Sequence, residues 1–382
     1  MTTFTRVDTS IVGRWWWTVD RGILLGIALL ITVGTILSLA ASPAVATRLG
    51  LDSYHFVQRQ FLFLVPAVVI MLGVSLLSPL TIRRVAAIMF IVIVPMMILT
   101  LFVGAEIKGS QRWLRIANIT IQPSEFLKPA FIVVSAWMLA EARQMEGFPG
   151  LRISAGLYLL VAALLLLQPD FGQTALLGGV WLVQLFLGGV TWIWIGTVGA
   201  AAVAGGFAVY STGGHVASRI DRFLNPASGD TFQIDTALNA FRTGGLFGRG
   251  PGEGVVKQIL PDAHTDFIFA VAGEEFGLIV CLFLAGLFAF VVLRGLSRLS
   301  RESDLFIVLA AGGLLVMFGL QAVINIGVNL NLLPSKGMTL PFISYGGSSL
   351  LALAIAMGMV LAMTRTRVGA SVVGPSGVEG RR

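Results

Sequence analysis

The feature that most constrains this chain is the length of its uncharged runs. Residues 171–218 contain no Asp, Glu, Lys or Arg. A helix needs about 20 apolar residues to cross a bilayer, so this run holds two spans, which we expect to be broken near Gly188-Gly189. The sequence predicts an all-α integral membrane protein with about ten transmembrane helices. The other predicted spans are residues 22–41, 60–82, 85–105, 125–140 (with two charges at its start), 153–169, 276–293 (extended upstream to Asp266), 305–331 and 341–364.

The composition excludes several classes of protein. Apolar residues make up 56% of the chain and charged residues 12%, about half the charged fraction of a soluble domain. The single Cys281 excludes an intrachain disulfide, and the three histidines lack the spacing of a zinc site. The net charge of +7 favours contact with anionic lipid. The basic residues are scattered over loops without a DNA-binding motif, which excludes a nucleic-acid partner.

Ten spans place both termini on one side of the membrane. With the N-terminus inside, fourteen of the 26 Lys and Arg lie inside, eleven lie in outer loops, and Lys128 lies in a helix. Five of those eleven lie in the long loop of residues 211–265, and long loops obey the positive-inside rule weakly. We therefore expect cytoplasmic tails at residues 1–20 and 366–382, a membrane domain at residues 21–365, and an extracytoplasmic loop at 211–265 between helices 7 and 8.

The start of the chain also resembles a cleavable signal peptide. Arg14 and Arg21 precede an apolar run that is followed by Ala44-Val45-Ala46. The apolar run has about 20 residues, whereas the apolar region of a signal peptide has about 7–15. We therefore expect a retained first span.

Charged residues beside a membrane span are costly to bury, so each is a candidate functional residue. The first group lies in the loop of residues 104–115. Trp113 is either an anchor in the interfacial aromatic belt or a platform for a sugar ring, and Arg112 would then bind an anionic group.

In the second group, Glu125 and Lys128 lie three residues apart on one helix face and can pair. Either the pair neutralises itself on burial, or Lys128 contacts a lipid-linked phosphate.

The third group joins the long loop to the eighth span. We expect Thr265 to be the N-cap and Asp266 to lie in the first turn. Such an aspartate either complements the helix dipole or serves as a general base, because partial desolvation at the membrane edge raises the pKa of its carboxyl group. Arg219 and Arg222 add cations to the loop. Its glycine clusters predict a loop that bends and covers the site; they are Gly244, Gly245, Gly248, Gly250, Gly252 and Gly254.

Two further acids lie deeper in the eighth span. At about 100° per residue, Glu274 faces about 80° and Glu275 about 180° away from Asp266. They cannot both share its face, so we expect them to bond to neighbouring helices.

The fourth group is residues 334–349, which combine Lys336 with a run of small residues. Small residues permit close contact between helices, and a phosphate-binding nest is the alternative. On the ninth span, Gln321, Asn325 and Asn329 recur every four residues, and interhelical hydrogen bonds explain them.

Five motifs occur in order at matching membrane depths. They are residues 109–113 (GSQRW), 122–125 (QPSE), 168–172 (QPDFG), 264–267 (HTDF) and 341–347 (PFISYGG). Together they closely resemble the SEDS family of cell-wall proteins over about residues 15–365. Residues 250–254, 261–264 and 337–344 resemble the division branch of that family, as found in Gram-negative bacteria, more than the elongation branch.

The resemblance implies a ten-helix peptidoglycan glycosyltransferase in the bacterial inner membrane, enriched at the division septum. Its substrate would be lipid II, its partners a class B penicillin-binding transpeptidase of the FtsI type and other divisome proteins, and its cofactor a divalent cation, Mg²⁺ or Mn²⁺. The family's essential carboxylate falls on Asp266 and its loop tryptophan on Trp113. The expected substrate-binding residues are Trp113, Arg112, Glu125, Lys128, Arg219, Arg222, His264 and Lys336.

The implied chemistry agrees with these residues. A sugar hydroxyl is a poor nucleophile at neutral pH, so Asp266 would remove its proton, and the cations would neutralise the departing diphosphate. Three alternatives stay open: a lipid II flippase, whose coupling charges usually lie near the midplane, a noncatalytic scaffold, and the role of the elongation paralogue.

Overall fold

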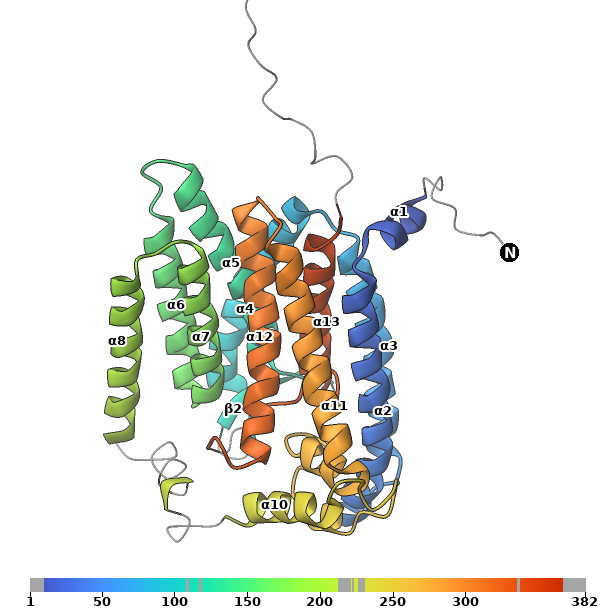
Figure 1. Ribbon diagram of the computed structural model, residues 1–382. Coiled ribbons are helices and arrows are strands. Elements are labelled where there is room, and N and C mark those ends of the chain that lie inside the picture. The colour runs from blue at the N-terminus through green and yellow to red at the C-terminus, as the bar shows by residue number, and fades with distance from the viewer. Residues whose placement is uncertain are drawn as a thin grey trace, which may run out of the picture.

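The computed structural model describes residues 10–107, 110–116, 119–211, 221, 223–225, 231–334 and 337–366. Within these residues, ten long helices run back and forth between two faces (Figure 1). Each predicted span overlaps one of them, although the predicted span 60–82 runs past the end of α3 into α4. The predicted break near Gly188 separates α7 from α8. The helices are α2 (Arg21–Arg48), α3 (His55–Ser75), α4 (Pro79–Val103), α5 (Pro123–Gln144), α6 (Gly150–Leu167), α7 (Phe171–Leu187), α8 (Trp192–Ser211), α11 (Ile268–Leu299), α12 (Leu305–Asn329) and α13 (Gly347–Met363).

These helices differ in how clearly they qualify as membrane spans. Six of those described, α2, α3, α4, α6, α11 and α12, are long and apolar enough to cross a membrane, and α7, α8 and α13 are shorter apolar helices. The remaining helix, α5, carries Glu125, Lys128, Glu141 and Arg143. The protein is therefore a multi-pass membrane protein, and its most polar long helix is α5.

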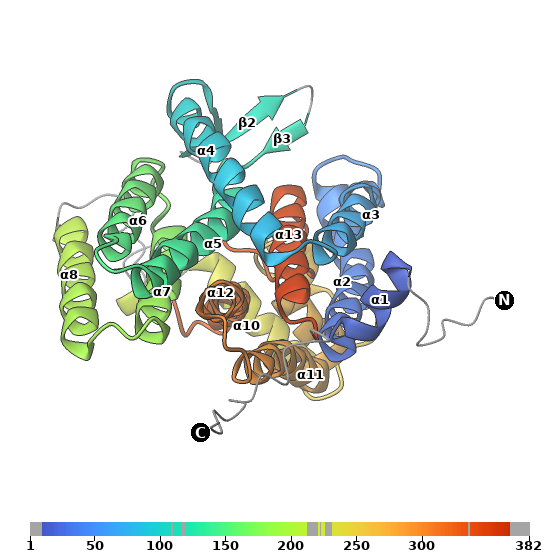
Figure 2. The ribbon, with the colours of Figure 1, turned by 90° about the horizontal axis from the view of Figure 1, so that it is seen from above.

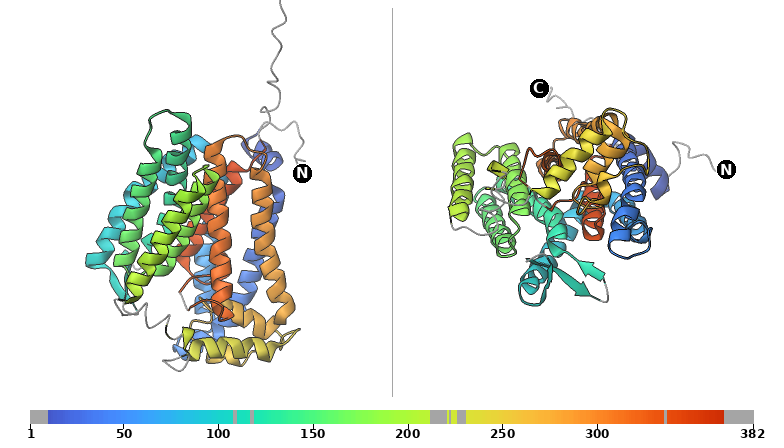
Figure 3. Two further views of the ribbon diagram at one scale, coloured as in Figure 1. Left: turned by 60° about the vertical axis from the view of Figure 1, so that its left-hand side comes forward. Right: turned by 90° about the horizontal axis from the view of Figure 1, so that it is seen from below.

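The bundle has two unlike faces. The first and last described residues lie at one of them, which we call the terminal face, as the even number of predicted spans requires. The opposite face, which we call the loop face, carries the strands and helix α10 (Phe232–Gly244), which lies crosswise beneath the bundle (Figures 1 and 3).

Helix α12 lies at the centre of the bundle (Figure 2). Buried residues make up 67% of its most apolar segment, against 28–39% in the other five clear spans. Its neighbours α5 and α13 are also buried along most of their length. Polar side chains on α12 are therefore held inside the protein, away from lipid.

The predicted helical fold is confirmed, and one small sheet accompanies it. Strands β1 (Ala105–Ile107), β2 (Ser110–Ile116) and β3 (Ile119–Ile121) form a small antiparallel sheet at the loop face, in the order β1-β2-β3. Leu114 pairs with Ile121 and Arg115 with Thr120. Isoleucine and threonine favour strands. These strands have only 3, 7 and 3 residues, so they are too short to stand out among apolar runs that span a membrane.

Part of the predicted N-terminal tail is helical. Within residues 1–20, Ile11–Thr18 form helix α1, and the Ser10 hydroxyl accepts a hydrogen bond from Gly13 N at 3.0 Å as its cap. Trp15 Nε1 donates to Ser75 Oγ at 2.8 Å, at the end of α3. Helix α1 is therefore packed against the terminal face.

Helix α11 is interrupted at Gly277, whose φ is 78° and ψ is −175°. The preceding loop replaces the lost helical bonds, because Leu278 N donates to Gly245 O and Arg249 N donates to Glu274 O, both at 3.0 Å. Inside a membrane protein, such freed backbone groups must be satisfied by protein. A Cβ added to Gly248 would lie 2.1 Å from Glu275 O. Close packing against α11, rather than a need for the loop to bend, therefore explains why residue 248 is a glycine.

Candidate active site

Asp266 lies on the loop face, in a tight turn that leads into α11. The carbonyl of Asp262 accepts hydrogen bonds from Thr265 N at 3.0 Å and Phe267 N at 3.3 Å. Because this turn occupies Thr265, the helix begins at Ile268 with Phe267 as its N-cap. The prediction that Thr265 caps the helix and that Asp266 lies in its first turn is wrong. The half-buried Asp266 precedes the helix.

The backbone of Asp266 is held by the polar side chains of α12. Asn325 Nδ2 and Asn329 Nδ2 both donate to Asp266 O at 2.9 Å, and Asn329 Oδ1 accepts from Ala270 N at 3.1 Å. The third side chain of this row, Gln321, donates to Thr339 O at 3.1 Å. The predicted interhelical hydrogen bond is present between Asn329 and Ala270 of α11. The other bonds go to the Asp266 turn and to the segment before α13, and those from Asn325 and Asn329 fix the position of the turn.

A second segment, residues 337–345, holds the turn from the other side. Ser344 Oγ donates to Thr265 O at 2.6 Å, and Asn325 Nδ2 donates to Met338 O at 2.6 Å. A Cβ added to Gly337 would lie 3.3 Å from Asp266 Oδ2, so this backbone passes beside the carboxylate. The Asp266 side chain is thus bordered by residues that are about 70 positions away in the sequence.

His264 belongs to an aromatic cluster in the same turn. Its ring centroid lies 4.3 Å from that of Phe56 and 5.5 Å from that of Tyr345, and Tyr345 N donates to His264 O at 2.9 Å. No pattern in the sequence indicated that Phe56, at the start of α3, lies beside the site. The cluster packs α3, the turn and the segment before α13 together.

The predicted pair in α5 is present and buried. Lys128 Nζ lies 2.8 Å from Glu125 Oε2, and the two side chains are 2% and 7% exposed. Lys128 Nζ also donates to Gln321 Oε1 at 3.2 Å, and Gln173 Nε2 donates to Glu125 Oε1 at 2.6 Å. The Lys128 ammonium is thus engaged by protein groups, which favours the structural interpretation of the pair. A contact between Lys128 and a phosphate stays a prediction.

Arg112 is engaged with the turn between α6 and α7. Its Nε donates to Gln168 O at 2.8 Å, its Nη2 donates to Pro169 O, and its Nη1 lies 3.3 Å from Asp170 Oδ2. Arg112 therefore joins two of the sequence motifs, residues 109–113 and 168–172. Its neighbour Trp113 is half-buried and pairs with Ala105 in the sheet.

The acids deeper in α11 bond differently from the prediction. The Glu274 carboxylate accepts hydrogen bonds from the backbone N–H groups of Val255, Val256 and Lys257 at 2.6, 2.7 and 2.9 Å. The Glu275 carboxylate pairs with Lys257 Nζ. Both acids thus bind the loop around the short 3₁₀ helix Val256–Gln258 instead of neighbouring helices, because the loop folds back over the break in α11.

Comparison with known proteins identifies the family. The sequence matches the profile of the family described as "Cell cycle protein", which groups FtsW, RodA and SpoVE, over residues 21–368. The chain belongs to this family. It is 50% identical over 368 residues to the probable peptidoglycan glycosyltransferase FtsW of Caulobacter vibrioides, covering 96% of this chain and 94% of the relative.

Solved structures agree with this membership of the FtsW/RodA/SpoVE family. A chain from a peptidoglycan synthase complex superposes with a TM-score of 0.75 at 27% identity, covering 91% of this chain and 98% of that chain. RodA, the rod shape-determining protein of Thermus thermophilus, gives a TM-score of 0.69 at 27% identity, covering 91% and 97%. The bundle therefore has the fold of this family.

Three predicted substrate-binding residues, Arg219, Arg222 and Lys336, lie outside the described residues. Among the others, the structure brings Asp266 and His264 into one turn. It links Lys128 and Glu125, through Gln321 on α12, to the segment 337–345 that borders that turn. Gln173, which holds Glu125, was missed, because nothing in the sequence ties a glutamine on α7 to an acid on α5.

Proposed function

We propose that this chain is a peptidoglycan glycosyltransferase of cell division, which polymerises lipid II with release of undecaprenyl diphosphate. Similarity to FtsW relatives along nearly the whole chain supports this activity. The observation that carries the mechanism is the Asp266 turn, in which two asparagines hold the backbone carbonyl. A half-buried carboxylate in a fixed position can accept a proton in a transition state.

In the proposed reaction, the C4 hydroxyl of one disaccharide attacks the anomeric carbon of another chain. A carbon–oxygen bond forms, and the bond between that carbon and the diphosphate oxygen breaks. The diphosphate leaves with the electron pair, and Asp266 takes the hydroxyl proton. Attack opposite the leaving group inverts the anomeric centre, so a second nucleophilic carboxylate is not needed.

The orientation in the membrane belongs to the same proposal. We place the terminal face in the cytoplasm and the loop face outside, because the arginine distribution favours it and because lipid II polymerisation takes place on the outer side. Cysteine labelling tests this orientation: a cysteine at Ser300, at the end of α11, should be labelled only from the cytoplasm. Labelling of Ser300→Cys by an impermeant reagent added outside intact cells would reverse the assignment.

A divalent cation is proposed only on the family resemblance. Among the described residues, no three His, Cys, Asp or Glu side chains converge to form a metal site. The residues present therefore do not fit a cage built from protein ligands alone, and we assign no step to a metal. Magnesium commonly binds through one or two carboxylates plus substrate phosphates. Loss of polymerisation in EDTA, with recovery on adding Mg²⁺ or Mn²⁺, would support the requirement.

The partner is proposed to be a class B penicillin-binding transpeptidase in the division septum. A chain of a solved peptidoglycan synthase complex with the same fold supports an assembly of this kind. Co-purification with the transpeptidase encoded in the same organism, and higher polymerisation activity in its presence, are the expected results.

The decisive experiment uses purified chain in proteoliposomes with labelled lipid II. Asp266→Asn keeps the size of the side chain but removes the base, so polymerisation should fall by about 10²–10⁴-fold, while folding and partner binding persist. Asp262→Asn is the matched control, because Asp262 lies in the same turn with a positive φ of 53°, which asparagine tolerates. It should retain activity.

Two outcomes would contradict this assignment. Undiminished glycan synthesis by Asp266→Asn would remove Asp266 from the mechanism. Transbilayer movement of lipid II by the unmutated chain, without any glycan product in the presence of its partner, would favour the flippase.

A further inference from the structure

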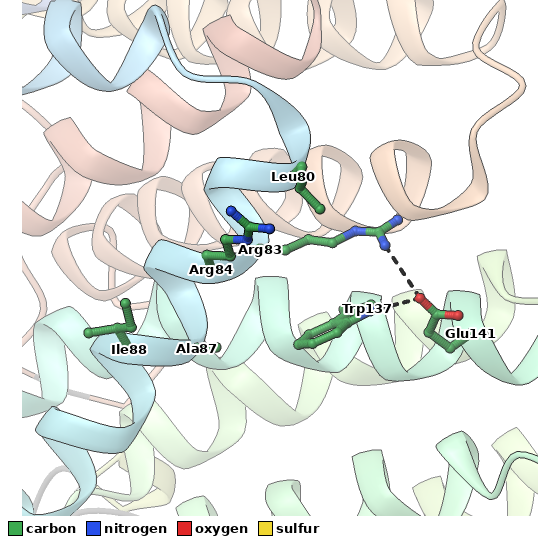
Figure 4. A pocket seen from close by; sticks show the side chains of 7 residues that line it. All are labelled: Leu80, Arg83, Arg84, Ala87, Ile88, Trp137 and Glu141. Atoms are coloured by element: carbon green, nitrogen blue, oxygen red, sulfur yellow. Dashed lines mark hydrogen bonds and ion pairs between the residues drawn. The ribbon is translucent and has the colours of Figure 1, made fainter.

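A groove of about 550 Å³ opens between α4 and α5 near the terminal face. It lies far from the Asp266 turn, at the opposite end of the bundle. The groove has a polar end and an apolar end (Figure 4). Arg83, Arg84 and Glu141 line the first, with Leu80 at its outer edge, and Ala87, Ile88 and Trp137 line the second, one helical turn deeper on the same two helices.

The two arginines differ in their partners. Arg83 Nη1 lies 3.4 Å from Glu141 Oε1, and its guanidinium lies 4.1 Å from the centre of the Phe306 ring on α12. Trp137 Nε1 also donates to Glu141 Oε1, at 2.9 Å. Arg84 is exposed, and the described part of the chain supplies it with no ion pair. The polar end therefore keeps one positive charge that is not neutralised.

We propose that this groove binds one anionic phospholipid of the surrounding leaflet. Arg84 holds the headgroup phosphate, and one acyl chain lies along Ala87, Ile88 and Trp137. From the arginines inward, the lining residues follow the order of the groups in a lipid, with charge toward the water edge and hydrocarbon toward the bilayer interior.

The chemistry favours this occupant over others. A soluble anion would gain nothing from the exposed Ile88 or from the Trp137 ring. A transmembrane segment of a partner protein would bury the exposed Arg84 against apolar side chains, which is costly without an acidic partner. Guanidinium groups match phosphate oxygens, and a bound lipid would connect the ends of α4 and α5 beside the Arg83 contact to α12.

The test measures lipid binding to the full chain in detergent by native mass spectrometry. The probes are palmitoyl-oleoyl phosphatidylglycerol and the matched phosphatidylcholine. The wild type should retain phosphatidylglycerol in preference, and Arg84→Gln should weaken that binding about fivefold, since one basic residue near an anionic surface contributes about that factor. Arg152→Gln is the matched control, because Arg152 is an exposed arginine in the first turn of α6 at the same face. It should change nothing.

A second variant tests the apolar end. Ala87→Phe fills the groove without changing its charge and should also weaken phosphatidylglycerol binding. Equal loss in Arg84→Gln and Arg152→Gln would mean general surface attraction and would overturn the proposal. Displacement of the lipid by excess inorganic phosphate would indicate a soluble-anion site. Unchanged binding in Ala87→Phe, or capture of protein instead of lipid by a photo-crosslinker at Ile88, would also overturn it.

Discussion

This protein has two buried glutamate–lysine pairs, one formed within a single helix and the other between a loop and a helix. Glu125 and Lys128 lie three residues apart within α5, whereas Lys257 and Glu275 are 18 residues apart and join a loop to α11. Both pairs are almost fully buried, with side-chain exposures of 7% and 2% for Glu125 and Lys128, and of 0% and 7% for Glu275 and Lys257. Helical spacing predicts the first pair, whereas only the folded loop creates the second.

The surroundings of the two pairs differ as well. Glu125 lies in the first turn of α5, where the helix dipole favours a negative charge, and Gln173 donates to it. Glu275 lies beside the break in α11, and Lys257 also donates to Ala40 O at 3.0 Å, in α2. Both pairs thus connect three parts of the chain. Among the described residues, the Glu275 carboxylate is bonded only to Lys257, whereas Glu125 also has Gln173, so we expect the loop pair to be the more sensitive of the two.

Removing the loop lysine should have the largest effect. Lys257→Met leaves the Glu275 carboxylate buried without its cation, and breaking a buried pair in this way costs about 3–5 kcal/mol. The expected result is a large loss of thermal stability, measured on purified protein by differential scanning fluorimetry. The double variant Lys257→Met/Glu275→Gln removes both charges and should recover most of the loss. A single variant that melts like the wild type would contradict the comparison.

The second largest effect is expected at Gly248, which packs against the backbone of α11. Gly248 has a φ of 79°, and an added Cβ would lie 2.1 Å from Glu275 O. Strain and overpacking together predict a loss of about 2–4 kcal/mol for Gly248→Ala. Gly252→Ala is the control, since Gly252 has a φ of 88° with no atom within 4 Å of the added Cβ, and it should lose only about 1 kcal/mol. Equal melting temperatures of the two variants would show that close packing is not the reason for Gly248.

The pair in α5 should be less sensitive. In Lys128→Met, Glu125 keeps the Gln173 hydrogen bond and the helix dipole, so we expect a loss of about 1–3 kcal/mol. The neutral double variant Glu125→Gln/Lys128→Met separates stability from substrate use. If it folds but uses lipid II poorly, the predicted phosphate contact of Lys128 gains support. If it polymerises normally, the pair is structural.

A third acid, at the water edge, gives the smallest expected effect. Burial alone would raise the pKa of Asp20, but hydrogen bonds from Arg294, Ile23 N and Arg298 hold this pKa below its ordinary value. A lowered folded-state pKa gives stability that is fully present above the unfolded pKa of about 4 and is lost as pH falls through the folded pKa. Melting curves from pH 6 down to pH 3 should show a smaller acid-induced loss in Asp20→Asn than in the wild type. Parallel curves would assign the acid sensitivity to other groups.

Helical periodicity accounts for the parts of the site that could be predicted. The row Gln321, Asn325 and Asn329 and the Glu125–Lys128 pair follow from spacings of four and three residues, which place side chains on one helix face. The start of α11 could not be predicted, because a turn closed by the carbonyl of Asp262 displaced Thr265 from the cap. The partners of Glu274 were also unpredictable, since they are backbone N–H groups of another segment.

The sequence by itself predicted which segments cross the membrane and that their number is even, and it determined which polar residues share a helix face. These follow from local chemistry, because the cost of placing charge and unpaired backbone in hydrocarbon acts on each segment separately. Only the tertiary structure decided that α12 holds the Asp266 turn and that Lys257 neutralises Glu275. It also decided that the loop of residues 245–249 satisfies the backbone groups freed by the break in α11 at Gly277. Each of these contacts joins segments whose approach depends on the packing of the whole bundle, and no local pattern encodes it.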